Sequence, residues 1–423
     1  MAKREHPEQV GPLVENLFRR ESGRLTAAIT RFFGSAHLEL AEDVVQDTLL
    51  KAMREWPFKG IPHDPVAWLH RVAKNGAIDR LRHDARGMEL LKENAPLLRS
   101  EWSLALTVNE ELREETITDD QLRMFFACCH PGMPAEQQIA LVLKTLCGFS
   151  VAEIARAFVT NEEAINKRLY RAREAFRGSG RLEIPGAEAL GARMEPVLAS
   201  IYLLFNEGYN STGHEDLIRE DLIEEALRLC DLLTQNPATD LPEVHALLAL
   251  MLFHAARNEA RTGADGGIIL LPEQDRTKWD PALIALAGRH LDIATRDGGF
   301  TSYQVEAAIA GLHANARTFA ATNWAGIVAL YDQLLLLKPT DIVRMNRAIA
   351  IGRLRGAAEG LKTLREVTGL ENNHIYQAAM GELRAATGDV EGARRSFHAA
   401  IASAPSPKER GLIEKKLNAT PGV

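Results

Sequence analysis

Residues Ser150 to Arg177, SVAEIARAFVTNEEAINKRLYRAREAFR, predict two short helices joined by a tight turn. Ser150 with Glu153, and Thr160 with Glu163, each match the S/T-x-x-E capping box that starts a helix. Each helix has one apolar stripe to bury. The other side of the second helix carries donors suited to base edges and phosphates: Asn166, Lys167, Tyr170, Arg171 and Arg173. This pattern predicts a helix-turn-helix whose second helix lies in the major groove of DNA.

The first 86 residues predict three longer helices, at about 10–33, 37–56 and 66–86, with an irregular loop marked by Phe58-Lys59-Gly60, Pro62 and Pro65. The second helix contains AEDVVQDTLLKA, whose carboxylates face outward; alone, this is typical of an ordinary solvated face. The third mixes aromatic, amide and guanidinium groups, which suits an unpaired strand whose bases stack. A further helix from Pro134 to Gly148 precedes the helix-turn-helix.

Composition indicates a large globular chain of two to four domains, with 423 residues, 46% hydrophobic and 25% charged. We find no apolar run long enough to cross a bilayer and no signal peptide, so we expect a cytoplasmic protein without a membrane partner. The net charge of −7 argues against tight DNA binding by the isolated chain. The segment Glu101 to Asp120 is strongly acidic.

No motif predicts a metal or cofactor. Cys128-Cys129-His130 is followed by no second ligand pair, and adjacent cysteines suit one tetrahedral ion poorly. We therefore expect reduced, buried thiols. The glycines of GADGG, within Gly263 to Trp279, match no phosphate-binding fingerprint and favour a structural turn.

Three motifs occur in the order found in bacterial sigma factors: AEDVVQDTLLKA, FKG followed by AWLHRVAKNGAIDRLR, and SVAEIARAFVTNEEAINKRLYRARE. The chain resembles the extracytoplasmic-function (ECF) subgroup, in the class with a fused C-terminal tetratricopeptide-repeat-like extension. The resemblance implies an all-α fold with sigma domain 2 at residues 10–90, an acidic inter-domain linker at 91–119, and sigma domain 4 at 120–178.

The resemblance also implies three sets of contacts, carried over position by position. The clamp helices of the largest RNA polymerase subunit would contact Asp43, Gln46 and Asp47, and the polymerase flap would be a second docking point. The −10 element of a promoter would be melted and read by Phe58, Arg71, Asn75 and Asp79. The −35 element would be read by Asn166, Lys167, Tyr170 and Arg171, with Arg168 and Arg173 on DNA phosphates.

Beyond Arg177 the pattern predicts a helical extension at 187–300 and tetratricopeptide-like repeats at 301–417. Ile327, Leu361 and Ala393 are separated by 34 and 32 residues, close to the period of stacked helix pairs. In the class that the chain resembles, such an extension is thought to replace a separate anti-sigma protein. We therefore expect control in cis, with a protein or small molecule as a possible partner of the extension.

The sequence thus predicts a promoter-specificity subunit of bacterial RNA polymerase with no catalytic residues of its own. The main alternative is an autonomous helix-turn-helix regulator with a ligand- or protein-binding repeat domain. A further alternative is a repeat-based binding protein or small-molecule-responsive enzyme with a vestigial sigma part. Its ligand would then be sought at Gly263 to Trp279 and Asn206 to Tyr209.

Overall fold

The computed structural model of the chain describes residues 7–82, 119–178, 187–211, 218–263, 266–296, 298 and 300–420. Within these residues every regular element is a helix, apart from one isolated bridge between Thr262 and Ile268, so the all-α prediction is confirmed. The chain forms two compact units. The first comprises Met1–Phe205 with Asp221–Asp240, and the second comprises Asn206–Glu220 with Leu241–Val423. The finer division into five segments stays a prediction.

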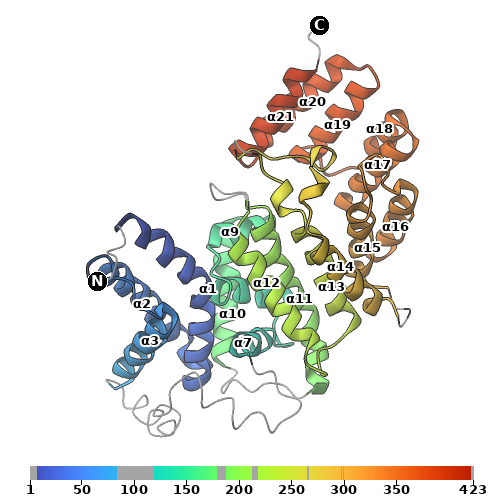
Figure 1. Ribbon diagram of the computed structural model, residues 1–423. Coiled ribbons are helices and arrows are strands. Elements are labelled where there is room, and N and C mark those ends of the chain that lie inside the picture. Colours follow the sequence, from blue (N-terminus) through green and yellow to red (C-terminus); the bar gives the residue numbers. More distant parts are fainter. Residues whose placement is uncertain are drawn as a thin grey trace. The chain divides into compact units, whose positions relative to one another are not determined.

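Three helices form the amino-terminal bundle of the first unit: α1 (Pro7–Phe33), α2 (Leu38–Lys59) and α3 (Pro65–Leu81). In Figure 1 they are drawn in shades of blue. Their core includes Leu25, Ile29, Val45 and Leu69, and the rings of Trp56 and Trp68 meet edge to face at 5.4 Å. The side chain of Asp64 accepts a hydrogen bond from the N–H of Ala67 and so begins α3.

A second bundle of the same unit contains α7 (Asp120–Cys128), α8 (Ala135–Thr145), α9 (Val151–Ala157) and α10 (Glu162–Arg177). The predicted capping box of Ser150 and Glu153 is present at the start of α9. The second predicted box is wrong, because Asn161 caps α10 and accepts from the N–H of Ala164. Val159, with φ of +50°, turns the chain between the helices, so the extended cap residue falls one position after Thr160.

Two helices beyond the helix-turn-helix connect the units: α11 (Ala187–Tyr209) and α12 (Glu220–Thr234). Almost all of α12 belongs to the first unit. It buries one apolar stripe: Leu222, Ile223, Ala226, Leu229, Cys230 and Leu233. Part of the predicted extension is therefore integrated with the sigma-like bundles.

The second unit is a succession of helices in which each contacts the next from α15 onward (Figure 1). They are α13 (Pro242–Ala255), α14 (Pro281–Ala294), α15 (Ser302–Ala314), α16 (Trp324–Leu337), α17 (Asp341–Arg355), α18 (Ala357–Arg365), α19 (His374–Ala386), α20 (Val390–Ser403) and α21 (Pro407–Ala419). Short 3₁₀ turns η2 (Asn258–Ala260), η3 (Leu271–Glu273) and η4 (Arg276–Lys278) lie between α13 and α14. A Cβ on Gly381 would lie 2.6 Å from the ring of Phe397, so glycine allows α19 and α20 to pack closely.

The four cysteines are free and buried, as predicted. Burial raises the pKa of the thiols of Cys128 and Cys147 well above the ordinary value. His130 is exposed, and its Nδ1 accepts from the N–H of Gly132. No helix in the described ranges is both long and apolar enough to cross a membrane. Nearly all of the predicted acidic linker, through residue 118, lies outside the described residues.

Candidate functional site

Helix α10 presents one polar face. Asn166 and Tyr170 are four residues apart, as are Lys167 and Arg171, and all four side chains are exposed. The opposite side of the helix is buried: Ile165, Leu169, Ala172 and Phe176. Nζ of Lys167 lies 2.6 Å from Glu163, an exposed pair that contributes little to stability. The predicted DNA-reading residues therefore share a face that packing leaves accessible.

Two arginines of α10 predicted to contact phosphates are engaged within the protein. Nη2 of Arg168 lies 2.7 Å from Glu136, and its guanidinium lies 5.3 Å from the centre of the Phe158 ring. Nη2 of Arg173 lies 2.8 Å from Glu42 of α2. Both arginines would have to exchange these partners to reach a DNA phosphate.

A second exposed face lies on α3 and at the end of α2. Arg71, Asn75 and Asp79 are spaced four residues apart and are exposed, with Oδ1 of Asp79 3.1 Å from Nη1 of Arg82. Phe58 is 90% exposed. The predicted loop is present but begins two residues later than expected, because α2 continues through Lys59 and ends at Gly60, whose φ is +84°. An exposed phenylalanine offers a stacking surface for an unpaired base.

The third predicted set lies on the outer face of α2. Asp43, Gln46 and Asp47 are exposed, and Arg80 of α3 forms ion pairs with both carboxylates. Leu50, which is 48% exposed, extends this face and follows Gln46 by four residues. Met53, which is 54% exposed, follows Gln46 by seven. The sequence interpretation missed both, although helical spacing from Gln46 would have found them.

The α1–α3 bundle contacts the α7–α10 bundle directly. A Cβ built on Gly23 of α1 would lie 2.0 Å from the carbonyl oxygen of Leu146, so only glycine permits this approach of the two backbones. Nη1 of Arg31 lies 2.5 Å from Oδ1 of Asp120. Burial raises the pKa of Asp120 despite this guanidinium.

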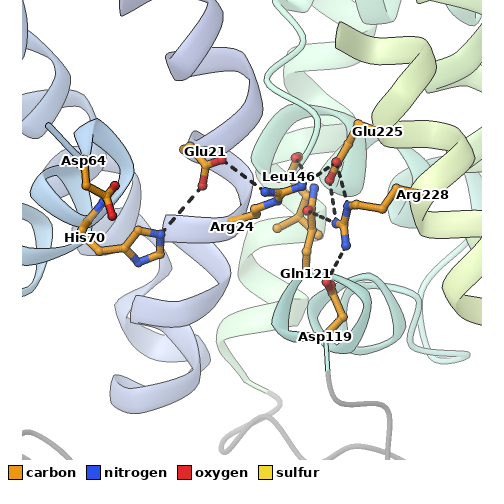
Figure 2. Close-up of polar contacts among 10 residues, drawn as sticks. Glu21, Arg24, Asp64, His70, Asp119, Gln121, Leu146, Glu225 and Arg228 are labelled. Atoms are coloured by element: carbon orange, nitrogen blue, oxygen red, sulfur yellow. Dashed lines mark hydrogen bonds and ion pairs between the residues drawn. The ribbon is translucent and has the colours of Figure 1, made fainter. Parts of the chain in front are cut away.

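Helix α12 also contacts the α1–α3 bundle, through the carboxylate of Glu225 (Figure 2). Nη2 of Arg24, on α1, lies 2.8 Å from Oε2 of Glu225. Nη1 of the same arginine lies 3.2 Å from Glu21. The Glu225 side chain is 12% exposed, so solvent screens this ion pair less than a surface pair.

Arg228, one turn further along α12, binds the α7–α10 bundle (Figure 2). Its Nη1 donates to Asp119 at 2.7 Å, and its Nη2 donates to Gln121 at 3.1 Å and Glu225 at 2.8 Å. Gln121 donates in turn to the carbonyl of Leu146. Burial alone would lower the pKa of Arg228, but Glu225 and Asp119 raise it above the ordinary value. Glu225 thus lies between cations that belong to different helices.

Family models match three parts of the chain. They are Sigma-70 region 2 over residues 17–87, Sigma-70 region 4 over residues 126–176, and a family of unknown function (DUF6596) over residues 193–295. The first two matches coincide with the two bundles that carry the exposed polar faces.

Relatives match either nearly all of the chain or about two-fifths of it. An uncharacterized protein of Rhizobium meliloti is 36% identical over 393 residues, which is 92% of each chain. The ECF RNA polymerase sigma factor SigE of Mycolicibacterium smegmatis is 26% identical over 39% of this chain and 61% of its own length. SigM of Mycobacterium tuberculosis is 28% identical over 38% of this chain and 72% of its own length. No solved structure matches.

Two sigma regions, each folded as a bundle with its polar face exposed, define a sigma factor of bacterial RNA polymerase. More narrowly, the chain belongs to the ECF sigma factors and carries a helical C-terminal extension. It acts with core polymerase and promoter DNA in transcription initiation. The α1–α3 bundle is region 2, and the α7–α10 bundle is region 4.

Proposed function

We propose that this sigma factor reads its promoter with two of the exposed faces and binds core polymerase with the third. Helix α10 reads the −35 element in the duplex, whereas the α3 face and Phe58 hold the melted −10 strand. The α2 face of Asp43, Gln46 and Asp47 binds the clamp helices. The observation that carries this assignment is the separation of each helix into one buried apolar side and one exposed polar side.

Arg71→Ala and Asn75→Ala should weaken open-complex formation while sparing binding to a −35 duplex. Both side chains act on the unpaired strand, where stacking and polar contacts contribute roughly 1–3 kcal/mol per base. Permanganate footprinting of the melted region should report about a tenfold loss, since 1.4 kcal/mol corresponds to tenfold. Unchanged melting with both variants would count against this assignment.

Lys167→Ala and Arg171→Ala should relax the preference for one −35 sequence. A good bidentate base contact contributes about 1–3 kcal/mol of discrimination. Selection of −35 sequences from a randomised promoter pool by the holoenzyme would measure the effect. Arg156→Ala is the control, because Arg156 is exposed on α9, outside the proposed reading face. Should the two α10 variants select the same sequences as the parent, α10 is not the reading helix.

We infer that the extension controls the sigma regions in cis by holding them together. The −10 and −35 elements lie about 25 base pairs apart, which is about 85 Å of duplex at 3.4 Å per base pair. Small helical bundles are on the order of 30 Å across. Regions 2 and 4 that touch at Gly23 and Leu146 therefore cannot occupy both elements. Promoter binding requires this closed arrangement to open.

Helix α12 is the element of the extension that favours the closed arrangement. Through Glu225 it contacts Arg24 of region 2, and through Arg228 it contacts Asp119 of region 4. A protein or small molecule bound to the repeat-like helices is the proposed signal for release. The chain has no catalytic role in this proposal, because polymerase forms the phosphodiester bonds. Its place of action is the cytoplasm, where polymerase works.

A further inference from the structure

Three arginines of the second unit converge between α13 and α14, and two aromatic residues join them. The guanidinium carbons of Arg257 and Arg276 lie 5.7 and 4.3 Å from the ring centre of Trp279. The guanidinium carbon of Arg261 lies 3.5 Å from the ring centre of Tyr209, and Arg257 donates to the hydroxyl of that tyrosine. We call Arg257, Arg261 and Arg276 the arginine cluster.

Two histidines beside the cluster add no positive charge at neutral pH. Burial, and then the nearby guanidinium groups of Arg257 and Arg261, hold the pKa of His254 well below its ordinary value. Nδ1 of His254 lies 3.1 Å from Nη2 of Arg257 and accepts its hydrogen bond, because an arginine can only donate. Burial, Arg257 and Arg276 lower the pKa of His313 to about 4.

Backbone carbonyls offset part of the arginine charge. Arg276 donates to the carbonyls of His313 and Ala316 at the end of α15, and Arg261 donates to that of Tyr209 at the end of α11. With the nearby end of α13, three helix carboxyl ends supply about −1.5 charges, at about −0.5 each. In the described part of the chain no carboxylate forms an ion pair with any arginine of the cluster. Among the described residues a positive surplus remains.

Several donors of the cluster are also without a protein acceptor among the described residues. Nη2 of Arg276 is buried and lacks a hydrogen-bond partner there, as does Nε1 of Trp279, whose side chain is only 5% exposed. Arg257 donates to described groups only through Nη2. Buried donors without acceptors are costly, and guanidinium groups bind oxyanions strongly through paired N–H bonds.

We propose that the arginine cluster binds a phosphate-type dianion, either inorganic phosphate or a phosphate monoester. A tetrahedral oxyanion can direct oxygens toward three separate guanidinium groups, whereas a planar carboxylate pairs best with the two parallel N–H groups of one guanidinium. The site belongs to the extension and does not depend on how the sigma regions read a promoter. It gives the extension a ligand class to which it can respond.

Isothermal titration of the full chain at constant ionic strength tests this site, with phosphate, glycerol 3-phosphate and succinate as separate probes. We expect saturable one-to-one binding of at least one phosphate probe and weaker binding of succinate. The tighter of the two phosphate probes identifies the source as free anion or monoester. Absence of saturable binding by both, or tighter binding of succinate, would overturn the proposal.

Arg257→Gln should weaken phosphate binding at least tenfold, while Arg289→Gln, the matched loss of an exposed arginine on α14, should leave it unchanged. If both substitutions weakened phosphate binding equally, the binding would be nonspecific attraction to positive charge, and the proposal would be overturned. If circular dichroism shows that Arg257→Gln does not fold, Arg257→Lys can replace it. Lysine keeps the charge but lacks the paired N–H groups of the guanidinium, so it should still weaken phosphate binding.

Discussion

Glu225→Arg should release regions 2 and 4 from each other and raise run-off transcription with limiting core polymerase. The new cation would face Arg24 and Arg228, whose side chains are 29% and 32% exposed. A fully buried pair would cost 3–5 kcal/mol to break, so solvent exposure reduces our expectation to about 1–3 kcal/mol. Because apparent affinity scales with the fraction of competent chains, roughly a tenfold gain in polymerase binding is expected.

Glu224→Arg is the matched control, because Glu224 is exposed on the same helix and undergoes the same charge change. If both variants gave the same run-off transcription, α12 would not be the element that holds regions 2 and 4 together. Gly23→Leu opens the same contact independently, since even a Cβ at this position would overlap the carbonyl of Leu146. If Gly23→Leu folds and gains no activity, closure of regions 2 and 4 is not inhibitory.

Leu50→Asp should weaken the binding of core polymerase by about 10- to 100-fold. Leu50 is a large exposed apolar side chain beside Gln46 and Asp47, and a buried anchor of an interface typically contributes about 2 kcal/mol or more. Competition between the variant and a labelled parent chain for core polymerase would measure the change in Kd.

Leu336→Asp is the control, because Leu336 is 85% exposed on α16 of the second unit. This substitution should leave the Kd unchanged. Binding of the Leu50→Asp chain as tight as that of the parent would show that the outer face of α2 is not the docking surface.

Local signals in the sequence predicted the helix-turn-helix well. The box of Ser150 and Glu153 depends on neighbouring residues only, and it formed. Thr160 and Glu163 have the same spacing, yet Asn161 caps α10, because the left-handed turn at Val159 sets which residue is extended. The spacing of residues in the sequence does not predict the φ angle of Val159.

Contacts between distant segments could not be predicted from local patterns. Glu42 and Arg173 are 131 positions apart, and nothing near either residue indicates the other. For the same reason the sequence did not reveal that α12 packs within the first unit. The glycines of GADGG were predicted to form a structural turn, and Gly263 to Trp279 was named as a ligand region only under an alternative. Nothing in the local pattern indicated that Arg276 of this segment lies close to Arg257 and Trp279.

This arrangement also changes how the extension should be studied. Truncation after Gly180 would remove α11 and α12, which contribute buried residues to the first unit, including Leu198, Phe205 and Leu229. The activity of a truncated chain would therefore reflect two opposing effects, a loss from unfolding and a gain from release of the closed arrangement. Single substitutions in α12 separate the two effects.

Whether regions 2 and 4 are held together in the free chain can be measured as a distance between them. Spin labels at Ala67→Cys and Ala175→Cys, both exposed positions, would report it, since the four native thiols are buried. We predict one short distance in the free chain, a longer one in Glu225→Arg, and an increase of tens of ångströms on polymerase with promoter DNA. The same distance in the free chain and in the promoter complex would show that regions 2 and 4 do not have to separate for promoter binding.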